Sequence, residues 1–224
     1  MKIVAINGSP RRTSNSAQML KAFEAGVLNV DPSAEIEYVD LYTLKFTGCI
    51  SCFSCKRKNG KFYGQCPVKD GIHDLIEHAY DADAVAIAAP IYLGDINAQT
   101  KCFLERALFS RTTYRLNHDS VAKKPVPVTM IYTMNCPKEL AGEIGYHRTF
   151  DTIELYVGNA FRHPVTRVCA YNTYQFNNYE DYEMEIFREE DKRSYREENF
   201  EADLRAAFDA GEKAARQALG EEES

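Results

Sequence analysis

The first 17 residues constrain the fold of this chain more than any other segment. Residues 2–7 are an apolar run that predicts a β-strand, and residues 8–16 are a loop rich in Ser, Asn and Arg that leads into an amphipathic helix. Small loop residues let backbone amides approach a phosphate, and a helix start adds free N–H groups and a positive dipole end. The loop lacks the three glycines of the dinucleotide fingerprint. It therefore predicts a mononucleotide phosphate loop, with an ordinary capped strand–turn–helix as the alternative.

Strand and helix patterns alternate through the first 170 residues. Strands are predicted at 2–7, 35–41, 84–90, 125–133 and 165–171, and helices at about 17–30, 71–80, 97–110 and 148–161. The run at 84–90 is continuously apolar with small side chains, which is typical of a central parallel strand covered on both faces. Five strands with intervening helices predict a doubly wound α/β fold, with a flavodoxin-like parallel sheet in the order 2-1-3-4-5.

Composition narrows the class of protein. A chain of 224 residues with 45% hydrophobic residues can form one α/β domain over 1–224, with a cysteine-rich loop at 43–69 and a C-terminal arm and helix at 179–224. The net charge of −6 argues against a nucleic-acid or anionic-membrane binder. The longest apolar run, 84–93, is about half of a membrane helix. We therefore expect a cytoplasmic protein with no nucleic-acid or membrane partner.

The seven cysteines are unevenly distributed. An odd number does not fit a closed disulfide framework. Three are scattered and are expected to be small buried apolar residues, whereas four crowd into the 43–69 loop. In a reducing compartment such a cluster indicates metal, iron–sulfur or thiol redox chemistry. The four candidate metal ligands are Cys49, Cys52, Cys55 and Cys66.

Three interpretations of this loop stay open. Three cysteines have C-x2-C-x2-C spacing, and ten residues then separate Cys55 from Cys66, so a [4Fe–4S] cluster requires an unusual excursion of the chain. A structural zinc ion is the second interpretation. The third, which we favour, is a set of thiols that oxidise reversibly or are inert. The lysines and arginine at 56–61 would lower thiol pKa values and suit an anionic cluster or partner.

Three loops are expected to meet beyond the carboxyl ends of the strands, where ligands bind in open α/β sheets. They are the loop at 8–16 and the segments 90–95 and 133–136. The second has an aromatic residue, a branched apolar residue and a glycine directly after a central strand, which suits a planar, mostly apolar heterocycle. Flavin fits this arrangement because its reactivity is its own and the protein mainly orients it.

These segments resemble the FMN-binding, flavodoxin-like NAD(P)H-dependent oxidoreductases, a family that includes FMN reductases and iron–sulfur flavoproteins. The matching segments are 7–17 (NGSPRRTSNSA), 48–69 (GCISCFSCKRKNGKFYGQCPVK) and 89–106 (APIYLGDINAQTKCFLER). The resemblance implies FMN as the cofactor. It would place the phosphate and ribityl end at Ser9, Arg11, Asn15, Ser16 and Ala17. The isoalloxazine ring would lie against Pro90, Ile91, Tyr92, Leu93, Gly94 and Thr133.

The resemblance further implies an oxidoreductase that passes electrons from NAD(P)H through flavin to a quinone, a free flavin, another small molecule or a redox protein. Hydride transfer from nicotinamide to flavin requires no protein acid or base, so we assign no catalytic side chain. The alternatives are a non-enzymatic electron carrier and a flavin- or thiol-based redox sensor. The Pro-Arg-Arg loop and the modest charge disfavour a flavodoxin-type carrier.

The last 45 residues change in character. Residues 179–199 are dense in charged side chains, and apolar residues then recur at helical spacing from Phe200 to Ala218, which predicts a final covering helix. The charged part is either a solvated surface helix or an arm that packs on a partner subunit. If it is an arm, it would place a neighbouring subunit over the flavin, and we expect a homodimer or tetramer.

Overall fold

The computed structural model describes residues 1–221 and is built on a central parallel sheet. Its main strands are β1 (Lys2–Asn7), β2 (Glu35–Asp40), β3 (Ala84–Tyr92), β5 (Val128–Thr133) and β6 (Val165–Ala170). Their spatial order is β2-β1-β3-β5-β6, and every neighbouring pair is parallel. Counted along the chain, this is the predicted order 2-1-3-4-5. The doubly wound α/β fold is confirmed.

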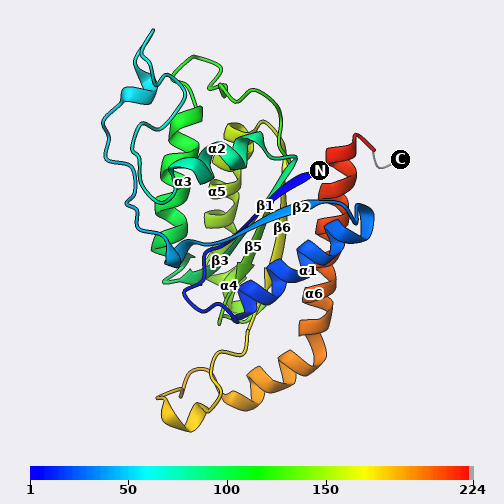
Figure 1. Cartoon of the computed structure of the whole chain (residues 1–224). Coiled ribbons are helices and arrows are strands. Elements are labelled where there is room, and N and C mark those ends of the chain that lie inside the picture. The colour runs from blue at the N-terminus through cyan, green and yellow to red at the C-terminus, as the bar shows by residue number, and fades with distance from the viewer. Residues whose placement is uncertain (222–224) are drawn as a thin grey trace.

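Helices cover both faces of the sheet (Figure 1). Side chains of β1 alternate between the faces: Ile3 and Ala5 pack with the helices α1 (Asn15–Val30) and α6 (Glu189–Leu219). Val4 and Ile6 belong to the other core. That core contains residues of the helices α2 (His73–Asp81), α3 (Ala98–Arg111) and α5 (Tyr146–Phe161).

Two glycines allow the helices α1 and α6 to approach each other closely. A Cβ atom on Gly26 of α1 would lie 2.0 Å from the carbonyl oxygen of Phe208. A Cβ on Gly211 of α6 would lie 2.1 Å from the carbonyl oxygen of Phe23. The backbones of the two helices are therefore in contact at these two glycines, where neither helix has a side chain. This contact fixes the position of α6 along α1.

Several boundaries differ from the predictions. The strand expected at 125–133 begins at Val128, because Pro125 and Pro127 have no N–H to donate to a sheet ladder. A short strand, β4 (Asp95–Ile96), pairs antiparallel with the end of β3. Short helices lie in segments for which no separate helix was predicted: α4 (Lys138–Glu143) and the 3-10 turns η1 (Leu41–Thr43), η2 (Ser54–Lys56) and η3 (Tyr179–Asp181).

The charged C-terminal segment is partly helical. Residues 189–199 are the first turns of α6, continuous with the predicted covering helix. In Figure 1 these turns and the preceding chain project beyond the carboxyl end of the sheet. Residues 222–224 of the predicted arm lie outside the described residues. Within residues 1–221, no helix combines the length and the apolarity that a membrane crossing requires.

Candidate functional site

The loop between β1 and α1 is a compact turn held by its own polar groups. The amide of Gly8 donates to the carbonyl of Ala88 on β3 at 2.8 Å. A Cβ on Gly8 would lie 2.0 Å from Oγ1 of Thr100, so only glycine fits this approach. The Ser14 hydroxyl donates to the Ser9 hydroxyl at 2.9 Å and caps α1 by accepting from the Ala17 amide. The loop is therefore preorganised around a helix N-terminus.

The predicted phosphate-loop residues lie together at the carboxyl edge of the sheet. Ser9, Asn15 and Ser16 are buried although polar. The hydroxyls of Ser16 and Thr133 are hydrogen-bonded at 2.7 Å, which joins the start of α1 to the end of β5 across 117 residues of sequence. The first-turn amides of α1, including those of Asn15 and Ser16, have no acceptor within the helix. This edge thus combines hydroxyl and amide donors.

The loop after β3 is a tight hairpin that presents apolar side chains to solvent. Tyr92 pairs with Asp95, and the two residues between them have φ values of 53° (Leu93) and 84° (Gly94). Positive φ at both central positions is the type I′ pattern, which is strained for leucine. Leu93 is fully exposed and Tyr92 is 46% exposed. An exposed aromatic and an exposed leucine at this edge suit a flat apolar ligand.

The two arginines of the phosphate loop have different partners. Arg11 donates from Nη1 to the carbonyl oxygen of Gln175 at 2.6 Å. Arg12 instead pairs with Asp40 through Nε and Oδ2 at 2.8 Å. The charge of Arg12 is therefore offset by the carboxylate at the end of β2, whereas the recorded partner of Arg11 is a neutral carbonyl.

Several polar residues at this edge were missed by sequence reasoning. The buried Asn97 donates from Nδ2 to the carbonyl of Gly8 and to the hydroxyl of Tyr42. Its Oδ1 accepts from Thr100 at 2.7 Å. Asn15 donates to the carbonyl of Tyr174, and Arg196 of α6 donates back to Asn15. Asn97 had a sequence signal, because it begins a predicted helix. Tyr174 and Arg196 had none, because they lie about 160 and 180 residues away from Asn15 in the sequence.

The four loop cysteines line one small cavity together with Arg106 and Phe109. The Cys66 sulfur accepts from Nε of the buried Arg106 at 3.4 Å. Lys56 donates to the carbonyls of Phe109 and Thr112 at the end of α3. Hydrogen bonds from Ser54 lower the pKa of the exposed Cys52 thiol, whereas burial raises the pKa of Cys55.

This arrangement does not fit a metal cluster in the conformation described. Over residues 1–221 there is no set of three Cys, His, Asp or Glu side chains placed to hold a metal ion. The cavity has a volume of about 20 Å³, which is room for one water molecule. All seven cysteines are free thiols.

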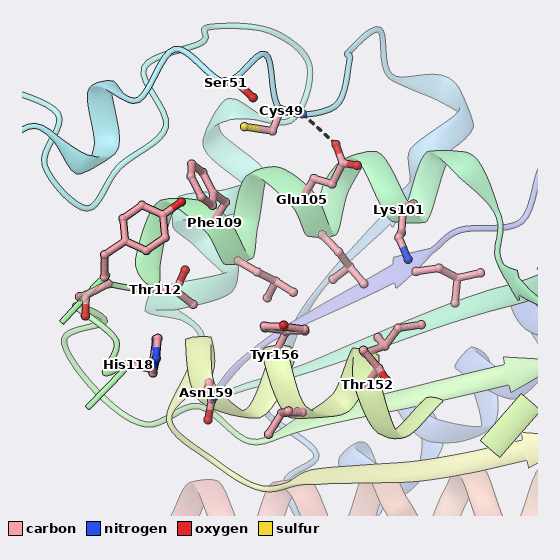
Figure 2. A pocket seen from close by; sticks show the side chains of 17 residues that line it. Cys49, Ser51, Lys101, Glu105, Phe109, Thr112, His118, Thr152, Tyr156 and Asn159 are labelled. Carbon is pink, nitrogen blue, oxygen red and sulfur yellow. Dashed lines mark hydrogen bonds between the residues drawn. The ribbon is translucent and has the colours of Figure 1, made fainter. Parts of the chain in front are cut away.

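A larger apolar groove lies between α3 and α5 (Figure 2). It has a volume of about 890 Å³ and runs from Ile96, next to the β3 hairpin, to His118. Tyr156 and Thr152 of α5 face Lys101, Glu105 and Phe109 of α3 across it (Figure 2). Its wall reaches the cysteine loop at Cys49, whose amide donates to the Glu105 carboxylate at 3.1 Å.

The amino-terminal part of the chain matches a known family. A family model described as NADPH-dependent FMN reductase matches residues 1–134. An iron–sulfur flavoprotein of Methanocaldococcus jannaschii is 28% identical over 118 residues, 53% of this chain and 58% of that protein. One of Archaeoglobus fulgidus is 34% identical over 109 residues, 48% of this chain and 46% of that protein. The chain spans about half the length of the curated relatives it matches.

Solved structures match over nearly the whole chain. The NAD(P)H:quinone oxidoreductase from Methanothermobacter marburgensis gives a TM-score of 0.69 at 17% identity, covering 100% of this chain and 99% of that one. An FMN-dependent NADH-azoreductase from Bacillus anthracis gives 0.63 at 14% identity, covering 97% and 100%. At these identities the likeness establishes the fold.

Proposed function

Because the chain belongs to the NADPH-dependent FMN reductase family, we propose that it binds FMN at the carboxyl edge of its sheet and catalyses electron transfer from NAD(P)H to an acceptor. The observation that carries this proposal is the Ser16–Thr133 hydrogen bond. It joins the donor-rich start of α1 to the strand next to the exposed Tyr92–Leu93 hairpin. One continuous edge thus offers donors for a phosphate and flat apolar contacts for a ring.

The residues at this edge fit FMN by their chemistry. Serine hydroxyls, first-turn amides and the Arg11 guanidinium suit a dianionic phosphate. The nearby Asp40 carboxylate is bound by Arg12 and by the Asn7 amide, which reduces its repulsion of an anion. Bound FMN would supply the redox chemistry by accepting electrons from nicotinamide and passing them on. The chain's own part is to hold the phosphate and to present the hairpin to one side of the ring.

The acceptor is proposed as a small molecule, of the quinone, flavin or azo class, or a redox protein. The quinone oxidoreductase and the azoreductase that share this fold support a small acceptor. Leu93 at the hairpin tip is fully exposed, so it offers an apolar surface that a planar acceptor could contact. A non-enzymatic carrier or a redox sensor is the alternative, and it would bind flavin without steady-state turnover.

The test is an absorption spectrum of anaerobically purified protein before and after NADPH or NADH, followed by turnover with a quinone. Flavin bands that bleach and are restored by the quinone support the reductase. Flavin bands that do not bleach favour a carrier or sensor. Protein that takes up no FMN contradicts the proposal.

The same sample tests the cysteine loop. Similarity to iron–sulfur flavoproteins and the presence of four cysteines in one loop favour a [4Fe–4S] cluster. The ten-residue gap before Cys66 and the small cavity favour free thiols. Our leading proposal for this loop is a set of free thiols that oxidise reversibly or are inert, with zinc as a further alternative. Stoichiometric iron and sulfide in the anaerobic protein would overturn that proposal.

We further propose a homodimer formed through the α3–α5 groove rather than through the C-terminal arm alone. Tyr114, Leu155 and Tyr156 around the groove are more than half exposed, which is unusual for a surface in contact with water. Lys101 and Glu105 lie one turn apart on α3. Within one copy Lys101 pairs with Asp95 at 2.9 Å and Glu105 accepts from the Cys49 amide at 3.1 Å. The Lys101 side chain is still 45% exposed, so a two-fold axis through the groove would bring its positive charge toward Glu105 of the other copy.

A single FMN-binding domain over residues 1–224 and a cytoplasmic location complete the proposal. The extension of α6 along α1 and its projection beyond the loop edge support one domain with an arm.

A further inference from the structure

A second hollow opens directly beside the phosphate loop. It lies between residues 11–18 and the arm segment 174–182, with Arg196 of α6 on its wall, and has a volume of about 550 Å³. This is within the range of small-molecule sites. Arg11, Ser14 and Asn15 belong both to this hollow and to the loop. A group attached to a phosphate on that loop would therefore enter it. We call this hollow the arm pocket.

Two cationic side chains border the arm pocket without a carboxylate partner among the described residues. Arg196 donates from Nη1 to Asn15 Oδ1 at 3.2 Å and from Nη2 to Gln18 Oε1 at 3.4 Å. Its guanidinium also lies 4.4 Å from the Phe200 ring centroid. Arg11 donates its side-chain hydrogen bond to the carbonyl of Gln175, on the other side of the pocket. Neutral partners leave both positive charges available for an anion.

The arm contributes a flat surface and amide groups. Tyr182 is 52% exposed and stacks on Phe176 with ring centroids 3.9 Å apart. Asn177 and Asn178 lie on the same wall and carry both donors and acceptors, as the edge of a purine requires. Asp181, the one acidic residue of the wall, is a suitable acceptor for ribose hydroxyls. Cation, aromatic ring and amides together suit a nucleoside phosphate better than a simple inorganic anion.

We propose that the arm pocket binds the adenosine-phosphate half of a dinucleotide. Two sources carry this group: the AMP half of FAD, continuing from the loop phosphate, and the adenosine end of NAD(P)H. The inference rests on the proposed function, because it takes the β1–α1 loop as the flavin phosphate site. If the group belongs to FAD, the pocket favours FAD over FMN. If it belongs to NAD(P)H, the pocket contributes to binding of the nicotinamide cofactor.

The experiment is calorimetric titration of the full chain with 5′-AMP, 2′,5′-ADP and inorganic phosphate, as apoprotein and after loading with FMN. We expect an adenosine phosphate to bind at least about 10-fold more tightly than phosphate. Arg196→Gln and Tyr182→Ala should each weaken that binding about 10-fold, whereas Arg205→Gln should not. Arg205 is the matched control because it is exposed on the same helix and pairs with Asp209. Since Arg196 contacts Asn15, Tyr182→Ala is the variant that separates the pocket from the phosphate loop.

Two further measurements distinguish FAD from NAD(P)H as the source of the adenosine phosphate. If FAD supplies it, apoprotein binds FAD more tightly than FMN, and Tyr182→Ala removes the difference. If NAD(P)H supplies it, 2′,5′-ADP competes with NADPH and Tyr182→Ala raises the KM for NADPH. Phosphate binding as well as AMP does, or variants that leave AMP binding unchanged, would overturn the proposal. Failure of the proposed function would be seen separately, as apoprotein that takes up no FMN while AMP binding is still measured.

Discussion

Leu93 combines two unfavourable properties, a positive φ and full exposure, at the tip of the β3–β4 hairpin. Asparagine tolerates this backbone, and Asn-Gly is the preferred pair for a type I′ turn. Leu93→Asn should therefore stabilise the apoprotein by about 1 kcal/mol. It should weaken FMN binding up to about 10-fold if the leucine packs on the ring, since that apolar contact is lost. Thermal unfolding and FMN titration measure the two effects.

Leu116→Asn is the control for that comparison, because Leu116 is equally exposed and does not have a positive φ. Leu116→Asn should change neither the stability of the apoprotein nor its affinity for FMN. Tighter FMN binding by Leu93→Asn would show that the leucine does not contact the flavin.

Lys192 is fully buried where α6 crosses the loops after β5 and β6. Its Nζ donates to the carbonyl of Asn135 at 2.5 Å and to Oδ1 of Asn172 at 2.7 Å. Burial lowers its pKa to about 8, although Cys136 and Asp191 act in the opposite direction. The folded state thus releases this proton before the unfolded state does. Above about pH 8 the unfolded chain binds more protons, so the free energy of unfolding rises with pH.

Lys192→Met should remove this rise in the free energy of unfolding with pH. Between about pH 7 and about pH 9.5 the wild-type free energy of unfolding should rise by about 2 kcal/mol relative to the variant. Urea unfolding at several pH values measures the difference. Parallel pH profiles would contradict the assigned pKa. The variant should be less stable throughout, because two acceptors lose their donor.

At the residue scale, sequence reasoning located donors that follow strands and missed partners brought in by folding. Ser16 and Thr133 were predicted to share one edge because both follow strand ends, and their hydroxyls are in contact. Arg196 and Lys192 fall in a segment whose charge density suggested a solvated surface, yet Lys192 is buried and Arg196 reaches Asn15. Charge density along a helix does not reveal which of its charges faces the protein.

The α1–α6 contact leaves no space for a side chain at either of its two glycines. Gly211→Ala would place a methyl group 2.1 Å from the Phe23 carbonyl oxygen, so the helices must separate. We expect a loss of about 1–3 kcal/mol, larger than the gain in helix propensity. Gly142→Ala in α4 is the control, because nothing lies within 4 Å of its Cβ position. It should be neutral or stabilising by up to about 1 kcal/mol. Equal stability of the two variants, measured by chemical unfolding, would show that α6 is not closely packed.

Elements with a strong hydrophobic period were predicted within a few residues, as for α5 and β3. The short ones were not, because β4, α4 and the 3-10 turns each depend on two or three local hydrogen bonds rather than on a repeating apolar face. For α6, a surface helix over the charged segment was one of two interpretations, and its continuity with the covering helix was not predicted. Its first turns carry three acidic residues and their helical state is continuous with the packed part.

For the whole molecule, the groove and the arm make different predictions about assembly. If copies meet through the α3–α5 groove, Leu155→Glu with Tyr156→Glu places like charges across the two-fold axis. This should raise the dimer dissociation constant roughly 100-fold or more. Ile186→Glu on the arm should leave it unchanged, although Ile186 is 85% exposed. Analytical ultracentrifugation of FMN-loaded protein measures both. Dissociation by Ile186→Glu alone would assign the interface to the arm, and a monomeric wild type would exclude both. The groove is the stronger candidate because its rim carries exposed apolar and aromatic side chains together with partly exposed charges of both signs. In the arm, by contrast, the charged turn at Arg196 already contacts α1 of its own chain through Asn15 and Gln18.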